Sequence, residues 1–282
     1  NMSLDVTGVR EDGYHEMMSV MQAVDLCDEL DLTVSPAPED TIVLKTDHPE
    51  IPDDRRNTAY RAAEKMLEIR SRILRERGET ESGIKAEITI RKKIPVAAGL
   101  AGGSSDAAGV MLGLNSLLEL GLKLDKLREA GTQIGADVPF CIRGGACITE
   151  GVGDVLNPCS PLPDCDILIA CAGEGVSTPE AYRALDAAYG GFAPEFCQPR
   201  TEQQDALLSA LAHGDLPGIG AHMFNLFESV ILPRHSTAAG LHAALTAAGA
   251  CGVRMSGSGP SVFGLFARGG AGAAYRALQS EG

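Results

Sequence analysis

The chain has 282 residues and a formal net charge of −14, from 24 basic and 38 acidic side chains. This acidic balance argues against a broad nucleic-acid or anionic-membrane surface, because neutralising phosphates requires a basic face. It still allows a small phosphate site built from backbone N–H groups. Charges or glycines interrupt the apolar stretches before the roughly 18 residues that a membrane helix needs. We therefore expect a cytoplasmic protein that binds neither nucleic acid nor membrane.

The cysteines show no metal-binding or redox pattern. None forms a C-x-x-C pair or has a histidine at metal-ligand spacing. Free thiols in a reducing cytosol are the expected state. The cysteines lie at positions 27, 141, 147, 159, 165, 171, 197 and 251.

The first half of the chain begins with strands and changes to helical spacing at Thr58. A turn is expected at 10–13, in Arg-Glu-Asp-Gly. From Thr58 onward, apolar residues recur on one face of a helix over 58–75. Alternating apolar and polar residues predict strands at 4–7, 30–34, 42–44 and 86–90.

The second half mixes helices and strands without regular βαβ alternation. This order favours an α+β fold over a doubly wound sheet, with a domain boundary near residue 150. A loop is expected at 189–201, where glycine and proline interrupt any period. Helices are predicted at 106–120, 125–134, 179–188, 203–213, 236–248 and 271–279, and strands at 166–171 and on both sides of a loop within 252–267.

A glycine- and serine-rich loop follows the strand at 86–90 and precedes the helix expected from Asp106. Its small side chains let the main chain approach a ligand, so that N–H groups and the positive helix end face phosphate oxygens. Ser104 and Ser105 add hydroxyls that can cap the helix, bind phosphate or contact Mg²⁺. The loop comprises Pro95, Val96, Ala97, Ala98, Gly99, Leu100, Ala101, Gly102, Gly103, Ser104 and Ser105.

Composition alone leaves two interpretations of this loop open. It is neither a Walker A loop, since no Gly-Lys-Ser/Thr ends it, nor a Rossmann fingerprint. A glycine-rich segment also forms tight structural turns without any ligand. The strand–loop–helix setting favours the anion site.

The pattern Pro-x-x-x-Gly-Leu-x-x-x-Ser-Ser over 95–105 resembles the ATP-binding motif of the GHMP kinases. A second segment, residues 254–261, resembles the third motif of that family, a glycine loop between two strands that closes over the phosphates. Alone, this segment predicts only a hairpin turn. The resemblance implies a two-domain α+β fold with a ribosomal-S5-like N-terminal domain at 1–152, a C-terminal domain at 153–282, and Mg²⁺ and ATP as cofactors.

Three further segments resemble signatures of the 4-diphosphocytidyl-2-C-methyl-D-erythritol kinase family. They read Arg-Glu-Asp-Gly-Tyr-His at 10–15, Gly-Ala-Asp-Val-Pro-Phe at 135–140 and Glu-Gly-Val-Gly-Asp at 150–154. With the two loops they span almost the whole chain in the family's order. The resemblance implies phosphorylation of the substrate's 2-hydroxyl, a step of the non-mevalonate isoprenoid pathway.

Asp137 is the catalytic residue that this resemblance implies. In the family the matching aspartate faces the substrate hydroxyl, where a carboxylate can accept the proton during phosphoryl transfer. Without the resemblance, an aspartate before Val-Pro predicts a helix cap or a turn.

The resemblance also implies a cytosine site at Tyr14 and His15. An aromatic ring stacks on the base, and main-chain or imidazole groups bond its edge. Tyr182 matches a family position on the other side of the base, although on its own it is an ordinary aromatic residue of a helix face. Further implied substrate contacts are Thr178, Asn1, Gly257 and Ser258.

Two more nucleotide-site residues are expected, each with an alternative. Asn57 is an N-cap by position and an adenine contact by resemblance, and both interpretations stay open. Ser105 is the candidate Mg²⁺ ligand, since hard oxygen ligands suit this ion and water can supply most of its shell.

The sequence departs from the family pattern at two places. The family's Lys-Ile-Asn-Leu aligns its asparagine with Asn1, so the lysine is expected two residues upstream, in a longer chain. Ala97, Ala98 and Ala101 replace glycines of some members, and alanine keeps the loop if φ stays negative.

Lys92 and Lys93 are candidates for holding the nucleotide or, alternatively, solvated charges at a strand end.

Competing functions remain at this point. A related GHMP kinase of the homoserine or phosphomevalonate type is one, although such small substrates have no base to stack on Tyr14. A non-catalytic GHMP-like ligand sensor is another, and it has no need of a base at Asp137. A monomer or weak homodimer is expected for this chain.

Overall fold

The computed structural model describes residues 1–80, 82–171, 173, 175–191 and 200–281. Helices and strands are mixed without βαβ repetition, as expected for the α+β class. Of the helices in the described ranges, none is both long and apolar enough to cross a membrane.

The chain divides into two compact units, which are described separately. Unit 1 comprises Asn1–Ala23, Ala97–Leu100 and Gly145–Gly282, and unit 2 comprises Val24–Val96 and Ala101–Gly144. These units follow other limits than the sequence-based division after residue 152, which stays a prediction.

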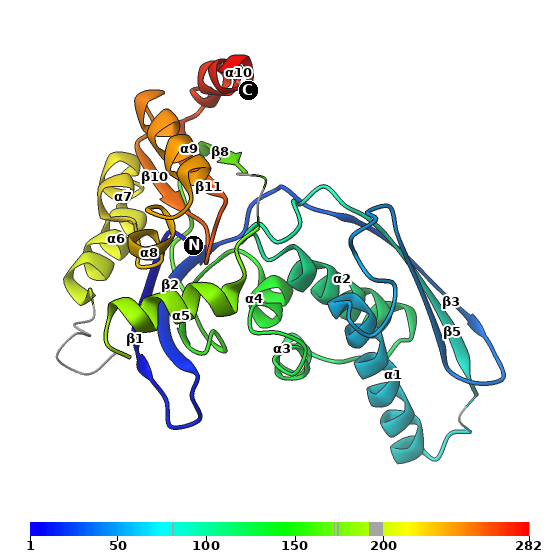
Figure 1. Cartoon of the computed structure of the whole chain (residues 1–282). Helices are drawn as coiled ribbons and strands as arrows, with labels where there is room; N and C mark the ends of the chain where they lie inside the picture. The colour runs from blue at the N-terminus through cyan, green and yellow to red at the C-terminus, as the bar shows by residue number, and fades with distance from the viewer. Residues whose placement is uncertain (81, 172, 174, 192–199, 282) are drawn as a thin grey trace. The chain divides into compact units, whose positions relative to one another are not determined.

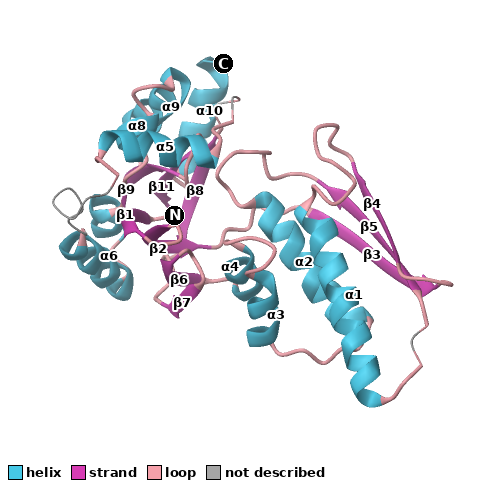
Figure 2. Ribbon diagram, turned by 60° about the horizontal axis from the view of Figure 1, so that its bottom comes forward, coloured by secondary structure: helices cyan, strands magenta, loops and turns pink. Residues whose placement is uncertain are grey.

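Unit 2 is a three-stranded sheet covered by helices. The central strand β5 pairs antiparallel with β3 and parallel with β4. Helices α1 and α2 lie side by side against this sheet (Figures 1 and 2). The elements are β3 (Glu29–Pro36), β4 (Thr41–Thr46), α1 (Thr58–Arg77), β5 (Ile84–Arg91), α2 (Gly102–Leu117), α3 (Leu124–Gly131) and α4 (Val138–Arg143).

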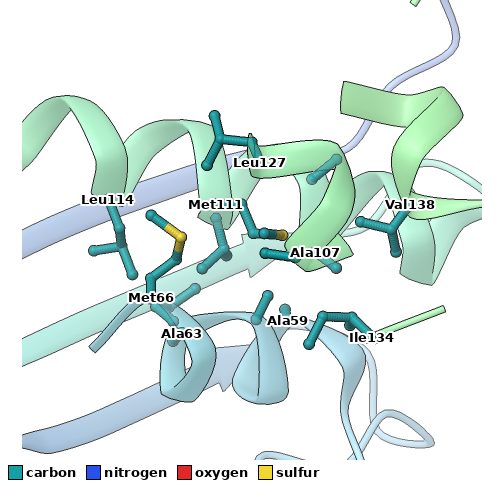
Figure 3. Close-up of a cluster of buried hydrophobic side chains, with 14 of the residues drawn as sticks. Ala59, Ala63, Met66, Ala107, Met111, Leu114, Leu127, Ile134 and Val138 are labelled. Carbon is teal, nitrogen blue, oxygen red and sulfur yellow. The ribbon is translucent and has the colours of Figure 1, made fainter. Parts of the chain in front are cut away.

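One hydrophobic cluster fills unit 2. Every second residue of β5 is buried, which places Ala86, Ile88 and Ile90 against the helices. Met66 of α1 and Met111 of α2 both belong to this cluster, as Figure 3 shows. This packing fixes the end of β5 and the start of α2, the two elements that the first glycine loop connects.

Unit 1 contains two sheets. The larger has the strand order β7-β6-β2-β1-β9, and the smaller has the order β10-β11-β8. Its strands are β1 (Ser3–Val9), β2 (His15–Gln22), β6 (Ala146–Gly151), β7 (Val155–Pro158), β8 (Cys165–Ala170), β9 (Phe224–Asn225), β10 (Gly252–Met255) and β11 (Val262–Ala267).

The helices of unit 1 pack on these sheets in pairs. Helices α5 and α8 share a core with β1, helices α6 and α7 share one with β2 and β11, and α9 and α10 cover β10 and β11. They are α5 (Thr178–Ala188), α6 (Thr201–His213), α7 (Leu216–His222), α8 (Glu228–Ile231), α9 (Ser236–Ala247) and α10 (Ala271–Glu281).

Most elements with clear periodicity occur where the sequence predicts them. The helix expected from Asp106 begins four residues earlier, at Gly102. Strands β2, β6, β7 and β9 and helices α4, α7 and α8 were not predicted. Of the loop expected at 189–201, residues 192–199 lie outside the described residues.

Candidate active site

Three alternate residues of the first glycine loop have a left-handed backbone conformation. Ala97 has φ 54°, Gly99 φ 72° and Ala101 φ 53°. The condition under which alanine suits this loop, a negative φ, is therefore not met at Ala97 and Ala101. A left-handed alanine costs roughly 1–2 kcal/mol, so the surrounding structure must hold the loop in this form.

The start of α2 is suited to an anion. Its first turn contains no acidic residue, and its N-terminal N–H groups carry the positive end of the helix dipole. Ser105 Oγ donates to Gly102 O at 2.9 Å, which leaves its lone pairs able to bind a cation. Thr58 Oγ1 of α1 donates to Gly103 O at 2.7 Å and ties this turn to the neighbouring helix.

The second glycine loop contacts the first loop directly. Ser256 Oγ donates to Gly99 O at 2.8 Å. A Cβ atom on Gly99 would lie 2.3 Å from Ser256 O and 2.9 Å from Gly259 O, so only glycine fits. The two segments that resemble family motifs therefore meet, although 157 residues separate them in the sequence.

Several predicted substrate contacts lie beside this second loop. A Cβ on Gly257 would lie 3.7 Å from Asn1 Oδ1, and Asn1 Nδ2 donates to Ser19 Oγ at 2.7 Å. The hydroxyls of Thr178 and Ser258 lie 3.0 Å apart, with either able to donate. The structure thus gathers Asn1, Thr178, Gly257 and Ser258 near one loop of unit 1.

Lys92 and Lys93 both face carboxylates. Lys92 Nζ lies 2.8 Å from Asp106 Oδ2 and also binds Asp28, and all three side chains are buried. Lys93 pairs with Glu29 at the surface. The Asp28 carboxylate also accepts the N–H groups of Lys93 and Ile94. Although burial acts to raise the pKa of Asp28, the hydrogen bond from Lys92 and these two N–H groups hold it below the ordinary value. The lysines therefore brace the strand end that leads into the loop.

Asp137 occupies the N-cap position of α4, but its side chain makes no capping hydrogen bond. Burial of the carboxyl group raises the pKa of Asp137 above its ordinary value. The thiol of Cys141, one turn further along α4, has its pKa raised to about 12 by burial and by the nearby charges of Asp137 and Asp106. A carboxylate with a raised pKa is a stronger base than one in water.

His15 and Tyr182 form an aromatic cluster in unit 1. Their ring centroids lie 4.4 Å apart with a tilt of 31°, and the Tyr182 ring meets Phe227 edge-on at 5.0 Å. His15 Nε2 lies 2.7 Å from Asp186 Oδ1, one turn after Tyr182 on α5. Tyr14 lies beside this cluster in sequence but is 67% exposed.

Asn57 caps α1 through its side chain. Its Oδ1 accepts from Ala59 N at 2.8 Å, and its Nδ2 donates to Pro52 O at 2.9 Å. The N-cap interpretation is confirmed, and the adenine contact stays a prediction.

Some residues that shape the site had no local signal in the sequence. Asp28, Thr58, Asp186, Asn225 and Glu228 act through contacts distant in sequence, such as the Thr58–Gly103 bond. Among the described residues no group of three or more His, Cys, Asp or Glu side chains is arranged to hold a metal.

Comparison with known proteins identifies the family. The model of the GHMP kinase N-terminal domain matches residues 57–145, and that of the GHMP kinase C-terminal domain matches 207–282. The chain is 42% identical over 267 residues to a 4-diphosphocytidyl-2-C-methyl-D-erythritol kinase of Exiguobacterium sibiricum, covering 94% of this chain and 85% of the relative. The chain belongs to the GHMP kinases.

Further relatives of this GHMP kinase agree. A protein of Bacillus mycoides with the same name is 40% identical over 265 residues, covering 94% of this chain and 84% of the relative. The crystal structure of a 4-(cytidine 5'-diphospho)-2C-methyl-D-erythritol kinase superposes with a TM-score of 0.75 at 34% identity, covering 100% of this chain and 93% of that one. A homoserine kinase from Cytophaga hutchinsonii shares the fold, with a TM-score of 0.67 at 23% identity over 94% of this chain and 84% of that one.

The family membership confirms the main sequence-based predictions. The motif resemblance, the GHMP kinase fold and the activity of an ATP-dependent small-molecule kinase are all supported by these matches. The roles of individual residues remain predictions.

Proposed function

We propose that this chain transfers the γ-phosphate of ATP to the 2-hydroxyl of 4-diphosphocytidyl-2-C-methyl-D-erythritol. The observation that carries the choice of substrate is the 40–42% identity, over 94% of the chain, to relatives named as kinases of this compound. The contact between Gly99 and Ser256 supports a nucleotide site, since it joins the two loops that resemble phosphate-binding motifs.

The first loop and the start of α2 bind the triphosphate of ATP in this proposal. Left-handed residues at 97, 99 and 101 turn the backbone tightly, which is typical of anion-binding nests. The dipole of α2 adds a positive potential at the same place. The nucleotide contacts are then residues 95–105, together with Asn57 beside the adenine.

Asp137 accepts the proton of the substrate hydroxyl as phosphoryl transfer proceeds. Its carboxylate is not used in capping α4, and burial raises its pKa, which increases its affinity for a proton. Positioning and charge stabilisation supply most of the catalysis in phosphoryl transfer, so proton acceptance accounts for only part of it.

The cytidine base binds at Tyr14, His15 and Tyr182. Tyr182 is anchored edge-on against Phe227, which supports a fixed stacking surface for the base. Tyr14 is largely exposed and has room to cover a ligand. The remaining contacts proposed for the substrate are Asn1, Thr178, Gly257 and Ser258.

Mg²⁺ enters this proposal as the companion of ATP. The ion usually keeps several waters and binds substrate phosphates with one or two protein oxygens, and Ser105 Oγ fits such a ligand. When bound, Mg²⁺ neutralises charge on the phosphate oxygens. We expect the protein to be located in the cytoplasm and to be a monomer or a weak homodimer.

Asp137→Asn tests the proposed base. We expect kcat to fall by roughly 10²–10⁴-fold while ATP still binds, because the amide cannot accept the hydroxyl proton. Steady-state kinetics and calorimetry with ATP measure the two effects. Asp125→Asn, on an exposed side chain paired with Arg128, is the matched control and should leave kcat unchanged. Undiminished turnover by Asp137→Asn would remove this residue from its role and favour a different base.

A substrate panel separates this proposal from its rivals. Turnover of homoserine or phosphomevalonate without turnover of the cytidine compound would reassign the enzyme within the GHMP kinases. Binding of ATP and ligand with no phosphate transfer would favour a ligand sensor. Only the cytidine compound offers a base to the cluster of His15 and Tyr182.

A further inference from the structure

The second glycine loop is held by side chains outside its own hairpin. Asn225, in the short strand β9, is 6% exposed. Its Nδ2 donates to Met255 O at 2.7 Å and to Gly257 O at 2.8 Å, and its Oδ1 accepts from Phe227 N at 2.9 Å. Two carbonyl oxygens require donors, so this network fixes which way the amide points.

Glu228 binds the other main-chain polar group of Met255, which is its N–H. It begins α8, and its Oε1 accepts from Met255 N at 2.6 Å. Burial raises the pKa of Glu228. Strand β10 is an edge strand of its sheet, so main-chain groups on its outer side need partners other than a strand. Asn225 and Glu228 provide those partners at Met255, where the strand enters the loop.

Met255 and Gly257, which Asn225 binds, are the sequence neighbours of the residue that contacts the first loop. Ser256 lies between Met255 and Gly257, whose carbonyls Asn225 binds. Ser256 in turn donates to Gly99 O of the first loop. The Gly99 Cα lies so close to Ser256 O that no side chain fits there. A shift of Ser256 therefore has to move the first loop or break this contact.

We propose that Asn225 and Glu228 are positioning residues for the ATP phosphates, acting through Met255 and Gly257 on the contact between Ser256 and Gly99. Neither side chain touches the nucleotide in this arrangement. The inference rests on the proposed function, because it takes the two loops as the phosphate site. It adds residues that neither loop motif contains.

Asn225→Asp is the sharpest test, because it keeps the size of the side chain. It replaces the Nδ2 donor by an oxygen that faces the carbonyls of Met255 and Gly257. We expect the KM for ATP, and the Kd of ATP with MgCl₂ by calorimetry without acceptor, to rise at least about tenfold. The KM for the cytidine substrate should change by less than about threefold, since its proposed base contacts lie elsewhere.

Asn115→Asp is the matched control. Asn115 of α2 ties a turn of unit 2 in the same way, with Nδ2 donating to Leu122 O at 3.1 Å and Oδ1 accepting from Leu122 N at 3.0 Å. It should lower the melting temperature without altering the Kd of ATP. An unchanged Kd in Asn225→Asp, or an equal rise in Asn115→Asp, would overturn the proposal.

A second pair of variants covers the case in which Asn225→Asp does not fold. Glu228→Leu removes the acceptor for Met255 N and should raise the Kd of ATP, whereas Glu228→Gln keeps an acceptor oxygen and should restore it. Equal affinities in both Glu228 variants and the wild type would contradict the proposal.

The calorimetric measurement also separates the two levels of inference. A wild-type chain that binds ATP but does not phosphorylate the cytidine compound would overturn the proposed function and leave this test in force. A wild-type chain that does not bind ATP would overturn both.

Discussion

Asp106 is a buried carboxyl group at the junction of the first loop and α2. The residue is 3% exposed, and its Oδ1 has no hydrogen-bond partner among the described residues. Lys92 binds its Oδ2 and also Asp28, so two carboxylates share one ammonium group. Burial raises the pKa of Asp106 to about 6, although Lys92 opposes the shift. Ionised Asp106 therefore carries a cost in the folded chain that it does not carry in the unfolded chain.

That cost predicts a pH-dependent effect of Asp106→Asn. With a raised pKa, the stabilisation of folding by Asp106 is complete below its ordinary pKa, near 3.9, and is lost as pH rises through about 6. The asparagine amide in the variant does not titrate, and Lys92 keeps its ion pair with Asp28. We expect the free energy of unfolding of the variant, relative to wild type, to increase by roughly 1–3 kcal/mol between about pH 4 and pH 8.

Urea unfolding at both pH values measures this difference. The exposed Asp125→Asn should show no such trend, which controls for the loss of one negative charge. Wild type and Asp106→Asn with the same pH dependence would mean that Asp106 titrates near its ordinary pKa. At the residue scale, Asp106 was predicted only as the first helical residue, because nothing local shows that Lys92 and Asp28 converge on it.

At the scale of elements, Asn57 has an observed structural role and a predicted binding role, and substitutions can distinguish the two. Its cap of α1 is observed, and its contact with adenine is a prediction. Replacing an N-cap asparagine by alanine costs about 1 kcal/mol, whereas serine caps almost equally well. We expect Asn57→Ala to lower both stability and ATP affinity, and Asn57→Ser to restore stability alone. Thermal unfolding and calorimetry with ATP measure the pair, and full recovery of ATP affinity in Asn57→Ser would leave Asn57 with the cap only.

How well an element was predicted from the sequence depended on its length and composition. Strand β5 and helix α1 have clear periods of two and 3.6, and both were found. The sequence indicates too late a start for α2, because Gly-Gly-Ser-Ser has low helix propensity and resembles a loop. Elements such as β9 and α8, of two and four residues, are too short to show a period. Asn225 lies on β9. The contact that suggests its role, with Met255 O, is 30 residues away in the sequence, so no local pattern indicates it.

At the scale of the whole molecule, the family was predictable and the compact units were not. The motifs follow one another in family order, so local sequence was sufficient to identify a GHMP kinase. Unit 1, by contrast, is assembled from three separate segments, and a four-residue piece of the first loop is one of them. A boundary read along the chain assumes continuous domains, and nothing in composition marks a short inserted segment.

Separate cores predict that the two units respond separately to core mutations. Met66 lies in the hydrophobic cluster described for unit 2, Leu207 lies in a cluster of unit 1, and both are fully buried. Truncating either to alanine should lower the free energy of unfolding by about 2–5 kcal/mol, through lost burial and a residual cavity. Because local opening follows local packing, Met66→Ala should speed amide hydrogen exchange mainly in α1 and α2, and Leu207→Ala mainly in α6 and β11. Hydrogen-exchange mass spectrometry on both variants measures this, each serving as the control for the other. Equal acceleration throughout the chain in both variants would show instead that the two cores unfold as one cooperative unit.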